Sequence, residues 1–347
     1  MKAAESKELK KARYEWLTAI IGLYKKDMAE RLAETHKIFG RPVLAVEIHT
    51  HSNYSDGCGT VEENYECFKR AGLDFIFITD HNSLGQKRIV RRWPDASWGQ
   101  EPGAGPHHIG LLCNRRRFRP RCDGIAADFE RAKKLAPFVW IPHPAGWYPR
   151  TWYNEEQIAT LWSLGETFAV EVMNGACKIF RAYDDFDEKA VAVWDRLLCD
   201  GRKVTALAAS DAHSPDDIGT AWTGVFAARR SAESIIEALN AGRSFASEAS
   251  LLDFSCDGHP MGAAMQKRKG ASLQLRFRAA DSAGIDSVRI ISQGKVVKQV
   301  EAKGRTLIES MWSCKAGAQP TYYRLESVAG DDRRAFSTPI YIVPTKP

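Results

Sequence analysis

Four short apolar runs in this chain, each with the length and composition of a buried strand, are followed closely by histidine-bearing motifs. Seven of the nine histidines lie in these motifs or in one adjacent pair. In a parallel α/β fold the carboxyl ends of the strands meet at one edge, and active sites form there. The pattern therefore predicts a cluster of imidazoles at that edge. The motifs are His49-Thr50-His51, Thr79-Asp80-His81, Pro142-His143-Pro144 and Asp211-Ala212-His213.

The region between residues 43 and 250 alternates short apolar strands with amphipathic helices. This alternation is typical of a parallel sheet, most simply a barrel. The pattern fails between residues 83 and 121, and irregular segments of that length are usually functional. The predicted strands are 43–48, 73–78, 138–141, 168–172 and 204–209, and the predicted helices are 61–71, 128–135, 155–164, 187–200 and 232–241.

The two ends of the chain differ from this alternating region. Residues 4–38 have helical periodicity up to the stop at Gly40-Arg41-Pro42, and we expect this helix to pack on the barrel exterior or to mediate association. After residue 250, period-two runs separated by turns predict the strands of an antiparallel β module at 273–278, 287–291, 296–300 and 322–328. We therefore expect a helical extension at 1–40, an α/β domain at 41–250 and a β-sandwich-like domain at 251–347.

Composition narrows the class of protein. The net charge of +6 is modest and dispersed, which argues against nucleic acid as a ligand and suits a small anionic one. The eight cysteines are scattered with no CxxC pair, so we expect buried free thiols. No apolar stretch approaches the ~20 residues that span a bilayer, and no signal peptide is evident. We expect a cytoplasmic protein without membrane contact, and leave a homo-oligomer open.

The motif spacing favours metal binding. Side chains two residues apart at a strand end point the same way, so His49 with His51, and Asp211 with His213, form two bidentate clips. Neutral imidazole and ionised carboxylate are the ligands that divalent transition metals take at neutral pH. The other groups expected to reach the same point are Asp56, His81 and His143.

A resemblance to a known family rests on these motifs. The chain resembles the PHP (polymerase and histidinol phosphatase) metallohydrolase domain in VEIHTHSNYSDG, AGLDFIFITDHNSLG, WIPHPAG and LAASDAHS. It looks like the carbaryl-hydrolase-like branch in TAWTGVFAARRSAESIIEALNAGRSFASEAS and FSTPIYIV. The resemblance runs from about residue 43 to the end. It implies a distorted (β/α)7 barrel of the α/β class, joined to a C-terminal β module, that holds two or three divalent ions, with Zn, Mn and Fe all compatible.

The same resemblance implies roles for individual residues. The glutamate that bridges metals in the family corresponds to Glu101, and the histidine after it to His108, with His107 as the alternative. Glu47 stands where the family has aspartate, and we expect it to orient a ligand because it points the same way as His49. The implied metal ligands are His49, His51, Asp56, His81, Glu101, His108, His143, Asp211 and His213.

Metal chemistry predicts the reaction type. Closely spaced divalent ions lower the pKa of a bridging water to near neutrality. We expect the resulting hydroxide, held by metals on Glu101, Asp211 and His213, to attack a phosphorus or carbonyl centre. The residues expected to contact the substrate are Arg115, Arg116, Asn174 and Lys178.

Each of these substrate assignments has a plainer alternative. Guanidinium groups match phosphate oxygens bidentately, yet a basic run such as Arg115 and Arg116 is also typical of a solvated face. Asn174-Gly175 also fits a turn. The sequence thus favours a phosphoesterase with a small ester substrate. A carboxyl-ester or carbamate hydrolase with the same site, an amidohydrolase-like fold, and an inactive metal-binding domain that binds a partner are the alternatives.

Overall fold

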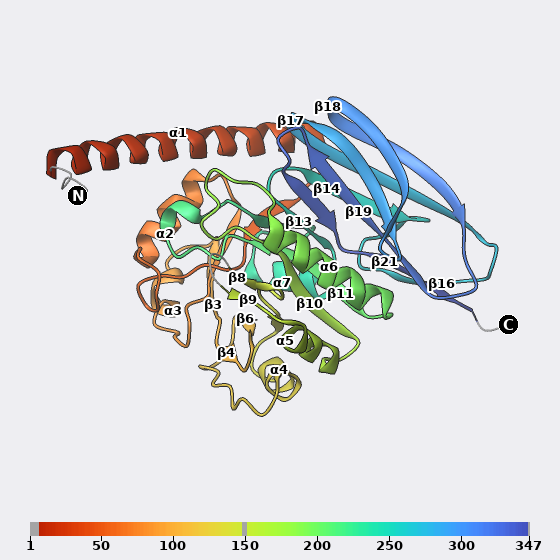
Figure 1. Cartoon of the computed structure of the whole chain (residues 1–347), viewed down its shortest axis with the longest axis horizontal. Helices are drawn as coiled ribbons and strands as arrows, with labels where there is room; N and C mark the ends of the chain where they lie inside the picture. Colours follow the sequence, from red (N-terminus) through yellow and green to blue (C-terminus); the bar gives the residue numbers. More distant parts are fainter. Residues whose placement is uncertain (1–6, 148–150, 346–347) are drawn as a thin grey trace, which may run out of the picture.

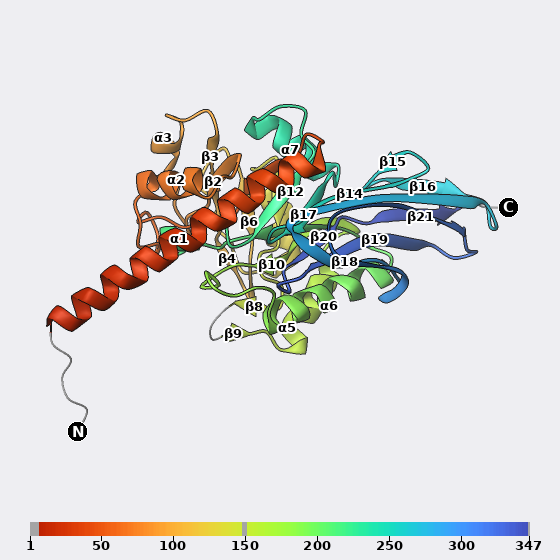
Figure 2. The ribbon, with the colours of Figure 1, turned by 90° about the horizontal axis from the view of Figure 1, so that it is seen from above.

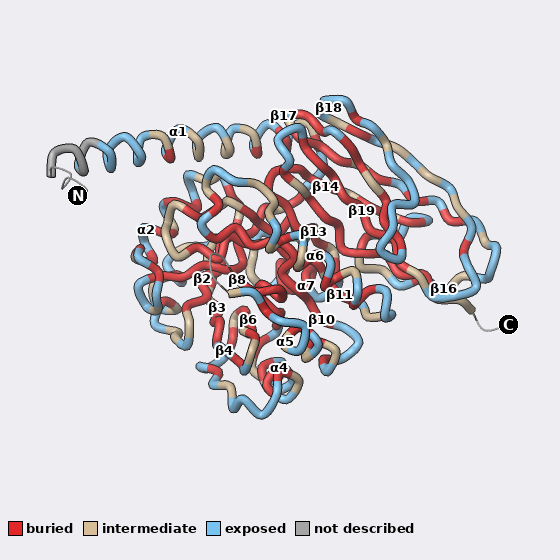
Figure 3. The backbone as a smooth tube through the Cα atoms, viewed as in Figure 1, coloured by how far each residue is buried: buried red, intermediate tan, exposed pale blue. Residues whose placement is uncertain are grey.

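The computed structural model describes residues 7–147 and 151–345. Figure 1 shows a long N-terminal helix lying across an α/β body, with a large β-rich part at the C-terminal end. Figure 3 shows that the buried residues run through the body and on into the C-terminal strands without a break. The chain is therefore a mixed α/β protein whose two parts share buried surface.

The helices begin and end close to the predicted limits. Thr60 caps α2 and Asp184 caps α6, each through a capping box in which a side-chain oxygen accepts a backbone N–H. The predicted helix at 155–164 is instead a short α-helix followed by a 3₁₀ turn. The helices are α1 (Lys7–Phe39), α2 (Val61–Arg70), α3 (Lys87–Val90), α4 (Ile125–Lys133), α5 (Glu155–Ala159), η1 (Thr160–Ser163), α6 (Asp185–Cys199), η2 (Pro215–Asp217) and α7 (Ala232–Asn240).

The strands of the body are short, and the central ones are buried on both faces. All four residues of Phe75–Ile78 are buried, which explains the continuous apolar run there. The strands are β1 (Leu44–Glu47), β2 (Phe75–Ile78), β3 (Ala96–Gln100), β4 (Gly103–Ala104), β5 (His107–His108), β6 (Gly110–Leu112), β7 (Phe138–Trp140), β8 (Gly146–Trp147), β9 (Thr151–Trp152), β10 (Thr167–Asn174), β11 (Lys203–Ala209), β12 (Trp222–Val225) and β13 (Ser244–Ser247).

The sheet of the body is mixed rather than wholly parallel. β1, β2 and β3 pair in parallel, but β6 is antiparallel to both β3 and β7, and β12 is antiparallel to β1. β10 and β11 form a separate parallel pair, linked to the end of β7 by a single bridge between Ile141 and Val170. The mixed α/β class is shown, and the (β/α)7 barrel stays a prediction.

The segment where the sequence pattern failed, 83–121, contains three paired elements. β3 lies parallel to β2, β6 returns beside it, and β4 with β5 forms a small hairpin between them. β3 escapes a pattern search because its buried positions include polar side chains. One of these, Gln100, is satisfied inside the protein, since its amide donates to the Phe118 carbonyl.

The C-terminal part is built on one very long hairpin. The runs predicted as separate strands, 273–278 and 287–291, belong to a single 21-residue strand, β17, which bends where its register shifts between Ala280 and Ile285. Its turn has positive φ at Gln293 and Gly294, as tight hairpin turns require. The strands are β14 (Leu251–Cys256), β15 (His259–Pro260), β16 (Ala264–Lys267), β17 (Ser272–Ser292), β18 (Lys295–Lys315), β19 (Thr321–Ala329), β20 (Arg334–Ser337) and β21 (Ile340–Pro344).

Hydrogen bonds tie the C-terminal part to the body. β13 pairs with β12 on one side and with β20 on the other, so one sheet passes through the expected boundary near residue 250. Arg324, buried in β19, pairs with Asp195 of α6 at 2.7 Å. The division into domains at 250 stays a prediction, although β14 begins at Leu251 as that division expects.

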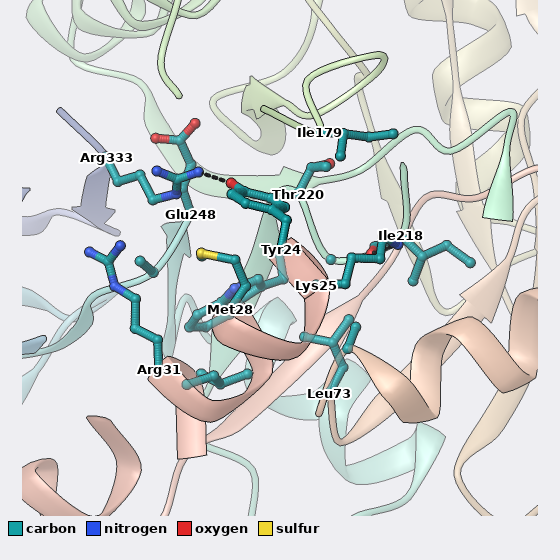
Figure 4. A pocket seen from close by; sticks show the side chains of 15 residues that line it. Tyr24, Lys25, Met28, Arg31, Leu73, Ile179, Ile218, Thr220, Glu248 and Arg333 are labelled. Atoms are coloured by element: carbon teal, nitrogen blue, oxygen red, sulfur yellow. Dashed lines mark hydrogen bonds between the residues drawn. The ribbon is translucent and has the colours of Figure 1, made fainter. Parts of the chain in front are cut away.

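Helix α1 lies against both parts with its C-terminal half only. Arg31 pairs with Asp281 of β17 at 2.8 Å, and the Lys25 ammonium donates to the carbonyls of Pro215 and Ile218. Figure 4 shows Tyr24 and Arg31 of this helix lining a small cavity of about 30 Å³ together with Arg333, whose guanidinium donates to the Tyr24 hydroxyl. The expected packing on the body is thus only part of the contact, and residues 4–6 of the expected helix lie outside the described residues.

Two expectations from composition are tested only in part. Among the described residues all eight cysteines are free thiols, but the expected burial is wrong for half of them. The exposed thiols are Cys58, Cys122, Cys177 and Cys199. No helix within residues 7–147 and 151–345 combines the length and the apolar content needed to cross a bilayer.

Arg31→Ala should destabilise the protein by about 3–5 kcal/mol, because it leaves the carboxylate of Asp281 buried without its partner. Urea unfolding, followed by circular dichroism, measures the change. Lys37→Ala removes an exposed pair with Glu34 on the same helix and should leave the midpoint unchanged. Equal midpoints for the two variants would contradict the role of the buried pair.

Glu248 makes stability depend on pH. It is buried at the junction, and burial, reinforced by the nearby Asp187 carboxylate, raises its pKa from 4.5 to about 8. A carboxyl group with a raised folded-state pKa contributes its full stability below pH 4.5 and loses it as the pH rises toward 8. Wild type should therefore lose stability relative to Glu248→Gln across that window in urea titrations. Parallel pH profiles would contradict this assignment.

Candidate metal centre

Backbone pairing sets three of the histidine motifs side by side. The amide of His51 donates to the Ala212 carbonyl, and the amide of Thr79 donates to the Thr50 carbonyl, both at 2.8 Å. Thr50 also forms a parallel bridge with Ala212. The ends of β1, β2 and β11 are therefore fixed next to one another, as the strand-end pattern predicts.

Glu101 is the centre of the cluster. It follows β3 directly, and its side chain is only 1% exposed. Five imidazoles surround its carboxylate, which is why β3 matters more than the sequence suggested. Their ring nitrogens lie at 2.8 Å (His108 Nδ1) and 3.0 Å (His143 Nε2) from Oε1, and at 3.0 Å (His81 Nδ1), 3.2 Å (His49 Nε2) and 3.4 Å (His51 Nε2) from Oε2.

Asp211 closes the inner side of the cluster. Its Oδ1 lies 3.0 Å from His51 Nε2 and 3.2 Å from His49 Nε2. Both Asp211 and His143 have positive φ, 47° and 30°, in a backbone region that side chains other than glycine's rarely occupy. Strain of this kind persists where the surrounding structure imposes it, and it gathers at functional sites.

Asp56 collects the outer histidines. Its carboxylate lies 3.3 Å from His213 Nε2, 3.5 Å from His81 Nε2 and 3.8 Å from His51 Nδ1. This outer group is the solvent-facing side of the cluster, since the side chains of Asp56 and His213 are 55% and 40% exposed. The three groups that could each hold an ion are His51, Asp56, His81 and His213; His49, His51, Glu101 and Asp211; and His81, Glu101 and His108.

Three buried atoms of the cluster fit a cation. In the described part of the chain, His51 Nδ1, Glu101 Oε2 and His143 Nδ1 have no hydrogen-bond partner. Unsatisfied buried polar atoms are costly, so they indicate a ligand that the protein chain does not itself supply. A divalent ion matches this set of imidazole and carboxylate donors.

Mutual electrostatics shape the protonation of these groups. Burial alone raises the pKa of Glu101, but the imidazoles of His108, His49 and His81 hold that pKa well below its usual range. Burial lowers the pKa of His213, yet its bond to Asp56 and the charge of Asp211 raise it to about 9. The carboxylates are therefore ionised and ready to bind cations.

A second layer of residues orients the cluster. Glu171 Oε2 lies 2.9 Å from His49 Nδ1, which leaves Nε2 directed at the cluster. The Asn174 amide donates to Glu171 at 2.7 Å and to Asp211 at 2.9 Å. Asn174 thus holds two acidic groups in place, which differs from the substrate contact expected for it.

Glu47 supports the two clips through the backbone. Its carboxylate accepts the amides of His49 at 3.2 Å and Ser210 at 3.1 Å. Burial raises its pKa to about 7. It fixes the main chain on both sides of the cluster, and its expected role of orienting a metal ligand stays a prediction.

The loop that carries Asp56 is held by Asp80, a residue the sequence analysis left without a role. Asp80 Oδ1 accepts the Ser52 amide at 2.7 Å and the Ser55 hydroxyl at 2.9 Å. A Cβ on Gly57 would lie 2.4 Å from the His51 carbonyl oxygen, so the loop closes only with glycine there. The aspartate of the Thr79-Asp80-His81 motif was the available signal.

The structure distinguishes the two adjacent histidines. His108 contacts Glu101, whereas His107 turns away and bonds the Gln157 carbonyl at 2.9 Å. Burial lowers the pKa of His107 to about 4, so it is neutral. Trp147 stacks on the His108 ring, with the two ring centroids 5.2 Å apart.

Arg115 and Arg116 do not join the cluster. Leu112 at the end of β6 pairs with Phe138 at the start of β7, so the chain leaves the sheet at the opposite edge from His143. β6 is antiparallel and carries them away from the cluster, and their expected contact with phosphate stays a prediction.

Lys178 also makes its ion pairs outside the cluster, and its expected contact with substrate stays a prediction. It is buried and pairs with Asp184 at 3.0 Å and with Asp187 at the start of α6. Burial lowers its pKa, but these two carboxylates outweigh burial and raise it. Lys178 anchors the helix, and its charge is already compensated.

The chain is similar to one family model and to several solved structures. A family model described as PHP-associated matches residues 197–244. The fold is similar to that of a two-domain protein from Bacteroides vulgatus containing a predicted PHP-like metal-dependent phosphoesterase. That match has a TM-score of 0.50 and 19% identity, and it covers 87% of this chain and 95% of that one.

Other solved structures show weaker likeness. PsfC from Pseudomonas syringae matches with a TM-score of 0.40 and 15% identity, over 57% of this chain and 87% of that one. A Bifidobacterium adolescentis protein, provisionally described as a metal-dependent phosphoesterase, matches with a TM-score of 0.34 and 14% identity, over 49% of this chain and 88% of that one. A search of curated proteins gave no significant match.

Glu171→Gln should weaken binding of a divalent ion about 10–100-fold, because a second-layer carboxylate fixes the tautomer and direction of His49. Competition with a chelator, read by elemental analysis, measures the affinity. Glu166→Gln, an exposed change just before the same strand, is the matched control. Wild-type affinity in Glu171→Gln would contradict the orienting role.

Proposed function

We propose that this chain is a metal-dependent hydrolase that cleaves phosphate esters. The observation that carries the proposal is Glu101, a buried carboxylate ringed by imidazoles, with buried donor atoms beside it that no protein group satisfies. The fold-level likeness to a protein containing a predicted PHP-like metal-dependent phosphoesterase supports the same reading.

The three ligand groups share residues and therefore act as one centre. In this proposal Glu101 is common to the inner groups, and His51 and His81 each belong to two groups. Two or three ions, with Zn, Mn or Fe matching the donors, supply an activated water near neutral pH and offset the charge that develops on the ester. We also propose that the chain belongs to the carbaryl-hydrolase-like branch that its sequence resembles.

The chain's own residues determine how substrate approaches. The side chains of His49 and His51 are fully buried, so access is from the side of Asp56 and His213. In this proposal His213 Nδ1 donates to the Asp211 carbonyl, which leaves Nε2 to bind an ion beside the Asp56 carboxylate. Glu101 and Asp211 stay ionised and would bind the metal ions on the buried side of the centre.

A carboxyl-ester or carbamate hydrolase is the second candidate. The arginines expected to clamp phosphate lie at the opposite edge of the sheet, so the anion would be recognised by the metal ions rather than by guanidinium groups. Trp147, stacked on His108, adds an apolar wall that suits an aromatic leaving group. Both features are compatible with a neutral ester.

Metal content and ester turnover test the proposal together. Purified protein should contain two or three metal ions per chain and hydrolyse p-nitrophenyl phosphate or bis-p-nitrophenyl phosphate. His49→Ala and Glu101→Gln should lose both properties, because Glu101 is shared by two of the groups and His49 is a fully buried donor of one of them. His259→Ala, an exposed histidine in the C-terminal part, is the matched control and should behave as wild type.

The same assay separates the alternatives. Arg115→Ala with Arg116→Ala should keep phosphatase activity, since these side chains leave the sheet at its other edge. Turnover of 1-naphthyl acetate alone would establish the second candidate instead. Protein without bound metal, and without activity on any of these esters after Mn or Zn is added back, would contradict both and leave a binding role.

A further inference from the structure

The N-terminal half of α1 projects from the molecule with its apolar side chains in solvent. Figure 2 shows the helix continuing well beyond the α/β body. Its large apolar residues are exposed at Tyr14 (72%), Trp16 (66%), Leu17 (44%) and Leu23 (64%). Single exposed apolar side chains are ordinary, but four within ten residues of one helix form a surface that a partner covers.

This surface continues an interface that the structure already contains. Apolar residues spaced three or four apart run along one side of α1, and from Ile21 onward that side packs on the body. Leu17 and Tyr14 extend the same stripe past the edge of the body. The residues of the stripe are Tyr14, Leu17, Ile21, Tyr24, Met28 and Leu32.

A groove lies beside the middle of the same helix. It has a volume of about 560 Å³, and Arg70 and Asp216 of the body form its far wall. The α1 side presents small residues at Gly22, Ala29 and Ala33, which let another helix approach closely. A Cβ placed on Gly22 would meet nothing within 4 Å, so the space there is open.

We propose that α1 is a dimerisation element, with the exposed half of each helix lying in the groove of a second copy of this chain. The protruding apolar side chains and the groove lie on the same helix. A two-fold axis would therefore place the apolar side chains of each copy in the groove of the other. Two antiparallel helices would also bring the exposed Lys11 and Glu15 of one copy toward Glu30 and Lys26 of the other, so that each charge meets its opposite.

The helix does not match the alternative occupant, a membrane surface. Interfacial helices gather their apolar residues on one face and their charges on the other. Here Trp16 lies one residue, and therefore 100° of helical rotation, from Leu17, and Glu15 lies between Tyr14 and Trp16. Apolar side chains therefore lie on the stripe and also away from it, as they do in a helix contacted on two sides by protein.

Light scattering after size exclusion tests the proposal. Wild type should have twice the chain mass of 38.8 kDa. The double variant Tyr14→Glu with Leu17→Glu should halve that mass by charging the protruding surface. Gly22→Leu should halve it independently by filling the groove, and it favours the helix, so the protein stays folded.

A matched control and a second measurement make the test decisive. Val296→Glu charges another exposed apolar residue (51%) in β18 and should leave the dimer intact. Circular dichroism should show native helix content in every variant. A monomeric wild type, or a dimer that survives both kinds of variant, would overturn the proposal. So would a monomer that co-sediments with anionic phospholipid vesicles, which would assign α1 to a membrane surface.

Discussion

One buried carboxylate, Glu101, constrains the whole α/β body. An ionised group that is 1% exposed must be compensated by charge or hydrogen bonds. The compensation comes from histidines after β1, β2 and β7 and within β5, so these elements have to end at the same point. To meet that requirement, the backbone adopts a strained conformation with positive φ at His143 and Asp211. The geometry of the cluster and the strain around it have one cause.

Much of the candidate centre could be predicted because its signals are local. A histidine directly after an apolar run needs no knowledge of the rest of the fold, and the structure brings all the expected ligands into one set of contacts. Glu101 was harder to place because β3 before it buries polar residues, such as Gln100, that pair inside the protein. Glu171 was missed as an orienting group because its partner, His49, lies 122 residues away.

The differences between the expected and the observed arrangement come from strand direction and from long-range pairing. Arg115 and Arg116 were expected near substrate, but an antiparallel β6 reverses the edge at which the chain emerges. Nothing in the composition of a three-residue strand indicates its direction. Likewise, period-two alternation found the C-terminal strands but could not show that two of its runs were halves of β17, since a bulged strand looks interrupted in sequence.

The pairing of β13 with both β12 and β20 has a consequence for how the two parts depend on each other. β20 covers a strand edge that would otherwise offer free amides and carbonyls to any passing chain. Shortening the protein to its α/β body would therefore expose the edge of β13, which could then pair with a strand of another chain. By pairing with β13, β20 of the C-terminal part keeps this edge from aggregating with other chains.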